Sequence, residues 1–219
     1  MLHIFYVGTC VLEAFLLLRL LYVDRWRENW SAMVFAVALV VVDAVVRPLC
    51  EQWYGTTSRV FFYTYWISDV VLLVLLFGVV CSFFPRSVRW VMLGFFAGMC
   101  ALAAAVLRFG FSQIAASGNL FIYAFEQILY MCCLALDTAL LVVGRCRGQC
   151  GISLRLFVSG IGIQTAGAAV ILACWVYQYP KDNGSLDYLP LATMLMLAAW
   201  LLATFVQTRE EKGEVKCGL

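Results

Sequence analysis

Four carboxylates lie inside four different hydrophobic runs of this 219-residue chain, and each run is long enough to cross a membrane. A charged side chain at that depth is costly to keep, so an intramembrane acid is a candidate functional residue. The four are Glu13, Asp43, Asp69 and Glu126. With a rise of about 1.5 Å per residue, Glu13 and Asp69 fall near mid-membrane.

One of these acids belongs to a charged stripe. Asp43, Arg47 and Glu51 follow at four-residue intervals, and Pro48 interrupts the backbone between them. On a helix this spacing places all three on one face, where they can neutralise one another. Two interpretations stay open. The stripe can be an ion network that fixes packing, or Arg47 can bind an anionic headgroup together with Arg108, which ends a later run.

Glu13 and Asp69 have no basic residue one turn away. Each therefore pairs across helices or is held protonated by its apolar surroundings. A protonated acid can donate a proton, so these two are the catalytic candidates if the protein is an enzyme. Tyr65 and Trp66 lie next to Asp69, where aromatic faces could stabilise a cation. The predicted ligand-binding residues are Asp43, Arg47, Glu51, Tyr65, Trp66, Arg108, Phe125 and Glu126.

The sequence does not predict a metal site. Most of the ten cysteines lie within the apolar runs, and the motif Cys146-Arg-Gly-Gln-Cys150 lacks the second ligand pair of a zinc site. The single histidine is His3, and no lysine lies in an apolar run, which excludes haem ligation by two histidines and a retinal-type Schiff base. The cofactor, if any, cannot be named, and nucleic acid is not an expected partner.

The composition sets the fold class. Hydrophobic residues make up 64% of the chain, charged residues 13%, and the mean hydropathy is +0.93. Because roughly 20 apolar residues cross a bilayer, we predict an all-α bundle of seven transmembrane helices. Their predicted ranges are 4–23, 31–50, 60–84, 88–107, 119–143, 152–177 and 188–208, which form one domain over residues 1–208 with a short cytoplasmic tail at 209–219.

The basic residues predict the orientation, since cytoplasmic loops carry the excess of Lys and Arg. Eleven lie on one side of the predicted bundle and four on the other. The N-terminus is thus expected outside and the C-terminus in the cytoplasm. The eleven are Arg19, Arg25, Arg27, Arg86, Arg89, Arg145, Arg147, Arg155, Arg209, Lys212 and Lys216, and the four are Arg47, Arg59, Arg108 and Lys181.

Glycines mark possible helix contacts. Gly94 and Gly98 form a GxxxG pattern that permits two helices to approach closely. Gly160, Gly162 and Gly167 leave part of another helix without side chains. These five residues are predicted to serve packing within the bundle or contact with a partner. Membrane lipid, other membrane subunits or a second copy of the chain are the expected partners.

Two motifs carry a resemblance. The stretch Phe61-Phe-Tyr-Thr-Tyr-Trp-Ile-Ser-Asp69, with Gly151-Ile-Ser-Leu-Arg155 and Gly160-Ile-Gly162, resembles uncharacterised seven-helix membrane proteins of bacteria, of the acidobacterial type. The resemblance implies a bacterial inner membrane and no particular activity. The architecture is also similar to that of small seven-helix terpenoid cyclases, but the Asn and Trp-Glu pattern of their second helix is replaced here by Arg47-Pro-Leu-Cys-Glu51.

Two classes of function follow from these observations. The first is a binding or subunit protein that holds a lipid, quinone, pigment, isoprenoid or partner helix near its polar residues. The second is an intramembrane enzyme, such as an acid-initiated cyclase or isomerase acting on an isoprenoid or lipid. We favour the first because no motif demands a reaction. A small transporter is a weaker alternative, which would require acids on both sides of the midplane and a discontinuous helix.

Overall fold

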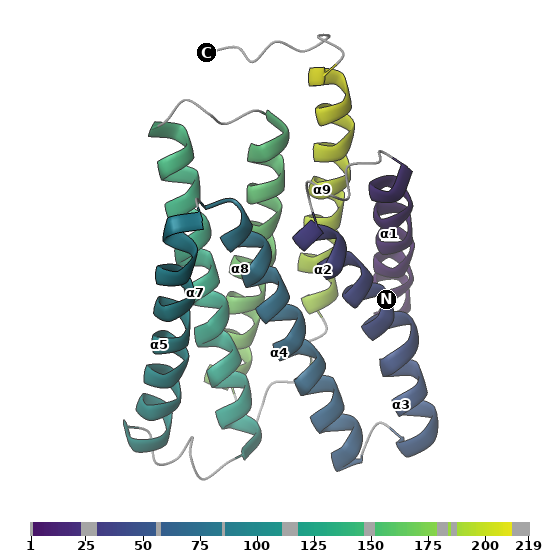
Figure 1. Ribbon diagram of the computed structural model, residues 1–219. Helices are drawn as coiled ribbons and strands as arrows, with labels where there is room; N and C mark the ends of the chain where they lie inside the picture. The colour runs from purple at the N-terminus through teal and green to yellow at the C-terminus, as the bar shows by residue number, and fades with distance from the viewer. Residues whose placement is uncertain are drawn as a thin grey trace. The chain divides into compact units, whose positions relative to one another are not determined.

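The computed structural model describes residues 2–22, 30–55, 58–84, 86–110, 118–146, 152–178, 184 and 188–211. These residues are almost entirely helical and include no strand, which confirms the predicted all-α class (Figure 1). The elements are α1 (Leu2–Tyr22), α2 (Trp30–Val41), the π-helical turn η1 (Val42–Val46), α3 (Arg47–Tyr54), α4 (Arg59–Ser82), α5 (Arg86–Gly110), α7 (Gly118–Cys146), α8 (Ile152–Gln178) and α9 (Leu189–Glu211).

Six helical stretches of the described chain are long and apolar enough to cross a membrane. They are 30–54, 59–82, 88–105, 121–142, 152–177 and 189–209. Their number and composition indicate an integral membrane protein. The 21-residue helix α1 is not among the six. Cys150 and the part of the predicted tail beyond Glu211 lie outside the described residues. The same is true of six basic residues used for the orientation prediction, which are Arg25, Arg27, Arg147, Lys181, Lys212 and Lys216.

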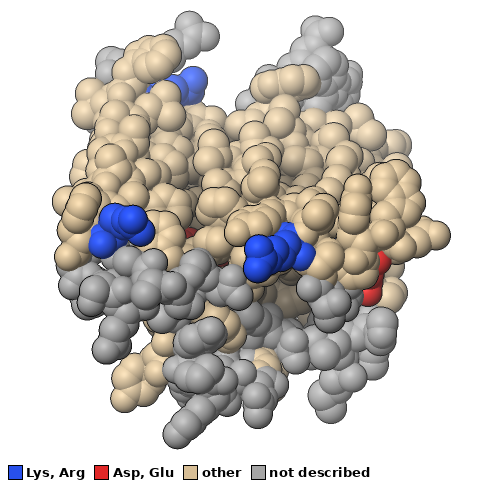
Figure 2. Space-filling model, turned by 90° about the horizontal axis from the view of Figure 1, so that it is seen from below, with Lys and Arg blue, Asp and Glu red and all other residues tan. Residues whose placement is uncertain are grey.

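The described surface suits an apolar environment. Figure 2 shows a face on which the described residues are nearly all uncharged, with a few separate patches of Lys, Arg, Asp or Glu. Large hydrophobic side chains are exposed along several helices, for example Val11 at 61% and Val91 at 63%. Such extended apolar surface is typical of a chain surrounded by lipid.

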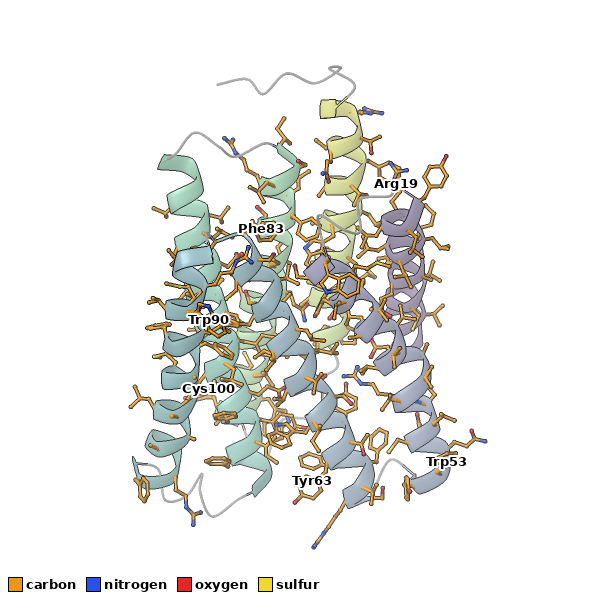
Figure 3. The ribbon with its side chains drawn as sticks, viewed as in Figure 1. Arg19, Trp53, Tyr63, Phe83, Trp90 and Cys100 are labelled. Atoms are coloured by element: carbon orange, nitrogen blue, oxygen red, sulfur yellow. The ribbon has the colours of Figure 1, made fainter. Side chains whose placement is uncertain are left out.

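The chain divides into two compact units, Met1–Val79 and Val80–Leu219, which are described separately. In the first unit, α1 packs against α2. Figure 3 labels Arg19 in the last turn of α1, Trp53 near the end of α3 and Tyr63 near the start of α4. Trp53 and Tyr63 are exposed, as aromatic residues at a membrane interface are.

A single continuous helix of 25 residues is formed by α2, η1 and α3. Within it, the backbone N–H of Arg47 donates to the carbonyl of Val42, five residues earlier, which makes the turn wider than an α-helical one. Pro48 follows directly, and a proline ring crowds the carbonyl four residues before it in a regular helix. The wide turn relieves this crowding. The helix ends at Gly55, whose φ of 72° is available to glycine without strain.

In the second unit, α5, α7, α8 and α9 pack in chain order. The closest helix pair is α8 with α9, where the indole of Trp200 stacks on Phe157 with ring centroids 4.2 Å apart. The same indole N–H donates to the carbonyl of Phe157 over 3.0 Å. A small residue opposite Trp200 is therefore needed, and Gly160 supplies it: a Cβ at that position would lie 2.8 Å from Trp200 Cδ1.

Candidate functional site

The first unit gathers three of the four predicted acids around one guanidinium. Nη1 of Arg47 donates to Oδ1 of Asp43 over 2.5 Å, and Nη2 donates to Oδ1 of Asp69. Asp43 comes from η1, Arg47 from the start of α3 and Asp69 from α4. The side chains are 17%, 8% and 20% exposed for Arg47, Asp43 and Asp69. The guanidinium thus ties the helix that contains the π-helical turn to α4.

Tyr65 covers the guanidinium from one side. Its ring centroid lies 4.0 Å from Cζ of Arg47, within the range of a cation–π contact. Tyr65 is one turn before Asp69 on α4, so this helix presents an aromatic face and a carboxylate to the same cation. Arg47 is therefore held by two carboxylates and a ring, which fixes its orientation.

Glu13 joins the site from α1. Its side chain is 1% exposed and lies close to the carboxyl group of Asp43. Oε1 of Glu13 is buried without a hydrogen-bond partner. We call Glu13, Asp43, Arg47, Tyr65 and Asp69 the Arg47 cluster.

Two other predicted residues of the first unit lie near the cluster in the chain. Glu51 is exposed and takes part in no ion pair among the described residues, since Arg47 turns to Asp69 instead. Nε1 of Trp66 is buried with no acceptor. The first unit therefore contains both a buried donor and a buried carboxyl oxygen without partners.

The remaining predicted ligand-binding residues belong to the second unit. Arg108 is exposed in the last turn of α5, whereas Glu126 is buried in α7. Phe125 stacks on Phe121, with ring centroids 6.3 Å apart and an interplanar angle of 3°. The seven charged candidate residues are thus divided between the two units, with Arg108 and Glu126 in the second and the other five in the first.

The glycines differ in their surroundings. A Cβ at Gly94 or Gly98 would meet no atom within 4 Å, and both residues are exposed. Added Cβ atoms at Gly160, Gly162 and Gly167 would lie 2.8 Å from Trp200, Asp137 and Ala192. Those three residues therefore lie where α8 meets its neighbours.

The candidate list from the sequence omits Asp137, a buried acid of α7 that is 1% exposed. The signal was present, because Asp137 lies within an apolar run and has no basic residue one turn away. No group of three or more His, Cys, Asp or Glu side chains that could hold a metal ion occurs in the described ranges.

Comparison of the chain with family models, with curated proteins and with solved structures gives no match. The resemblances to uncharacterised bacterial membrane proteins and to terpenoid cyclases therefore stay expectations.

Proposed function

We propose that the chain crosses a bacterial inner membrane seven times, with its N-terminus outside and its C-terminus in the cytoplasm. The six apolar stretches support this proposal, and α1 adds a seventh helix of 21 residues. Its exposed side chains include Val7, Val11, Phe15 and Leu18, which suit contact with lipid. The division of Lys and Arg, eleven against four, favours the orientation.

We propose further that the protein is an integral membrane protein that binds an apolar ligand next to the Arg47 cluster. The observation that carries this proposal is the engagement of Arg47 by Asp43, Asp69 and Tyr65. A guanidinium held in this way fixes the positions of the two carboxylates and the ring around it. Asp69 accepts a hydrogen bond from Arg47, so it serves there as an acceptor and not as the proton donor that an acid-initiated reaction needs.

The unpartnered atoms of the first unit favour a class of ligand. Trp66 Nε1 can donate to a carbonyl oxygen, and Glu13 Oε1 can hydrogen-bond with a hydroxyl group. A buried polar atom without a partner is unfavourable, so a ligand that satisfies it gains affinity. An apolar molecule with a carbonyl or hydroxyl head, such as a quinone, an isoprenoid or a lipid, fits these requirements.

The proposal is tested by native mass spectrometry of the protein extracted gently from its own membrane, followed by analysis of the bound lipids and quinones. Wild type is expected to retain one apolar molecule at fixed stoichiometry. Glu13→Met and Trp66→Phe each remove one hydrogen bond to the ligand, so bound ligand should fall about two- to tenfold. Glu51→Met and Trp53→Phe are matched controls, because both of these residues are exposed.

Two results would contradict ligand binding at this cluster. One is equal loss of bound molecules in the variants and in the controls. The other is copurification of further membrane subunits, or of a second copy of the chain, with no small molecule. The cluster would then serve assembly, as a fixed set of ion pairs.

A small transporter is the second candidate, and the π-helical turn favours it. Polar groups at irregular points of helices are a recurring feature of transporter binding sites, and η1 places Asp43 in a widened turn of an otherwise continuous helix. Uptake of a labelled cation or of protons into proteoliposomes, lost in Asp43→Asn, would support transport. Proteoliposomes that take up neither would exclude these two substrates.

A further inference from the structure

The second unit contains a buried acid that is not part of the Arg47 cluster. Asp137 is 1% exposed, and its Oδ1 has no hydrogen-bond partner. The residue lies within the apolar stretch Phe121–Val142 of α7. Unlike Asp43 and Asp69, it has no ion pair among the described residues.

The carboxyl group of Asp137 lies close to helix α8. Oδ2 of Asp137 lies 2.8 Å from the point that a Cβ on Gly162 of α8 would occupy. One turn further along α8, the hydroxyl of Thr165 donates to the carbonyl of Ile161 over 3.0 Å, so its proton is already used. The glycine thus lets the carboxyl group approach the backbone of α8, where a larger side chain at position 162 would collide with it.

The titratable groups around Asp137 are thiols. Cys133 lies one turn before it on α7, and Cys132, Cys100 and Cys81 surround Cys133. Thiols in this setting carry no charge near neutral pH. On α8, Arg155 lies two turns from Gly162 on the same face and is exposed. No described cation therefore compensates a charge on Asp137.

An isolated ionised carboxylate in such surroundings is prohibitively unfavourable, whereas the neutral acid is tolerated. We infer that Asp137 is a proton-binding site of the second unit, in which a single neutral carboxylic acid is held between α7 and α8. The ligand is a proton, because Oδ1 has no hydrogen-bond partner and no described cation is paired with the carboxyl group. This inference does not depend on the proposed ligand of the Arg47 cluster.

An apolar carbodiimide tests the inference on the wild-type protein. N,N′-dicyclohexylcarbodiimide reacts with protonated carboxyl groups in apolar surroundings. The carboxyl oxygen bonds to the central carbon of the reagent while the acid proton moves to nitrogen. The acyl group then migrates to nitrogen, and a stable N-acylurea forms without loss of any atom. Peptide mass spectrometry locates the adduct.

At neutral pH we expect the apolar reagent to label Asp137, and a water-soluble carbodiimide with an added amine to leave it unlabelled. Exposed Glu51 should show the opposite preference. Labelling of Asp137 should fall as the pH is raised, because only the protonated acid reacts. Asp137→Asn should abolish this adduct, while Glu126→Gln on the same helix should keep it.

Three outcomes would overturn the inference. Asp137 could stay unlabelled by the apolar reagent at neutral pH, or react only at acidic pH as an exposed acid does, and either would show that it is ionised. Equal reaction with the water-soluble reagent would show that water reaches it. Because the adduct is mapped on the wild-type chain, the test holds even if Asp137→Asn fails to fold.

Discussion

The two units handle buried acids in opposite ways. In the first unit, Asp43 and Asp69 share one guanidinium, and Glu13 lies close to Asp43. In the second, Asp137 lies close to Gly162 and to the thiol of Cys133, and its Oδ1 has no hydrogen-bond partner. Removing one member of a buried ion pair is destabilising because the charge that remains has no partner. An acid without a partner depends on its own proton.

The largest effect is expected from breaking the cluster at its centre. Arg47→Met leaves Asp43 and Asp69 without their cation, which should destabilise the protein by about 3–5 kcal/mol. Thermal unfolding in lipid nanodiscs measures the change. Arg59→Met is the matched control, because Arg59 is exposed at the start of α4. An unchanged unfolding temperature in Arg47→Met would mean that the cluster does not hold the unit together.

The second effect sharpens the contrast between the units. Asp43→Asn weakens a charge-assisted hydrogen bond to Arg47, at a cost of about 1.5–3 kcal/mol. Asp137→Asn replaces a neutral acid by a neutral amide of the same shape and should change stability by less than about 1 kcal/mol. Unfolding temperatures of the two variants, measured side by side, test the difference. Equal destabilisation would contradict the assignment of different roles to the two acids.

A smaller difference is expected between two glycines of the second unit. Gly160→Ala places a Cβ 2.8 Å from Trp200, so the indole must shift, which costs about 1–3 kcal/mol. Gly94→Ala meets no atom within 4 Å and should stabilise α5 by up to about 1 kcal/mol. The stability of each variant is compared with wild type by thermal unfolding. Tolerance of Gly160→Ala would show that α8 and α9 can separate at little cost.

The sequence predicts the helices well because each is a long and mainly apolar run. The helix predicted over residues 152–177 is α8, Ile152–Gln178, and that over 60–84 is α4, Arg59–Ser82. The contact of Arg47 with Asp43 could also be foreseen, since four residues are one helical turn. The pairing of Arg47 with Asp69 could only be stated as an option, because one chain does not reveal which helices are neighbours.

The backbone at Asp43 was only partly foreseeable. Pro48 indicated a loosened helix, but the widening lies before the proline, in Val42–Val46. Glu51 shows the limit of spacing arguments: it shares the stripe with Arg47 and yet is exposed, because Asp69 takes the second nitrogen of the guanidinium. Asp137 shows the same sequence signal as Glu13 and Asp69, but it lies in the opposite half of the predicted bundle from the other charged candidates.

The wide turn also sets the direction in which Arg47 points. An α-helix advances about 100° per residue, and a π-helical turn absorbs one extra residue without rotating the segments that flank it. If η1 took regular α-helical geometry with the same sequence, everything beyond it would rotate by about 100° around the helix axis. Arg47 would then face away from Asp69. Deleting one residue within Val42–Val46 would regularise the turn and leave that direction unchanged. For a chain of this length, the wide turn is therefore what allows Arg47 to join α3 to α4 by charge.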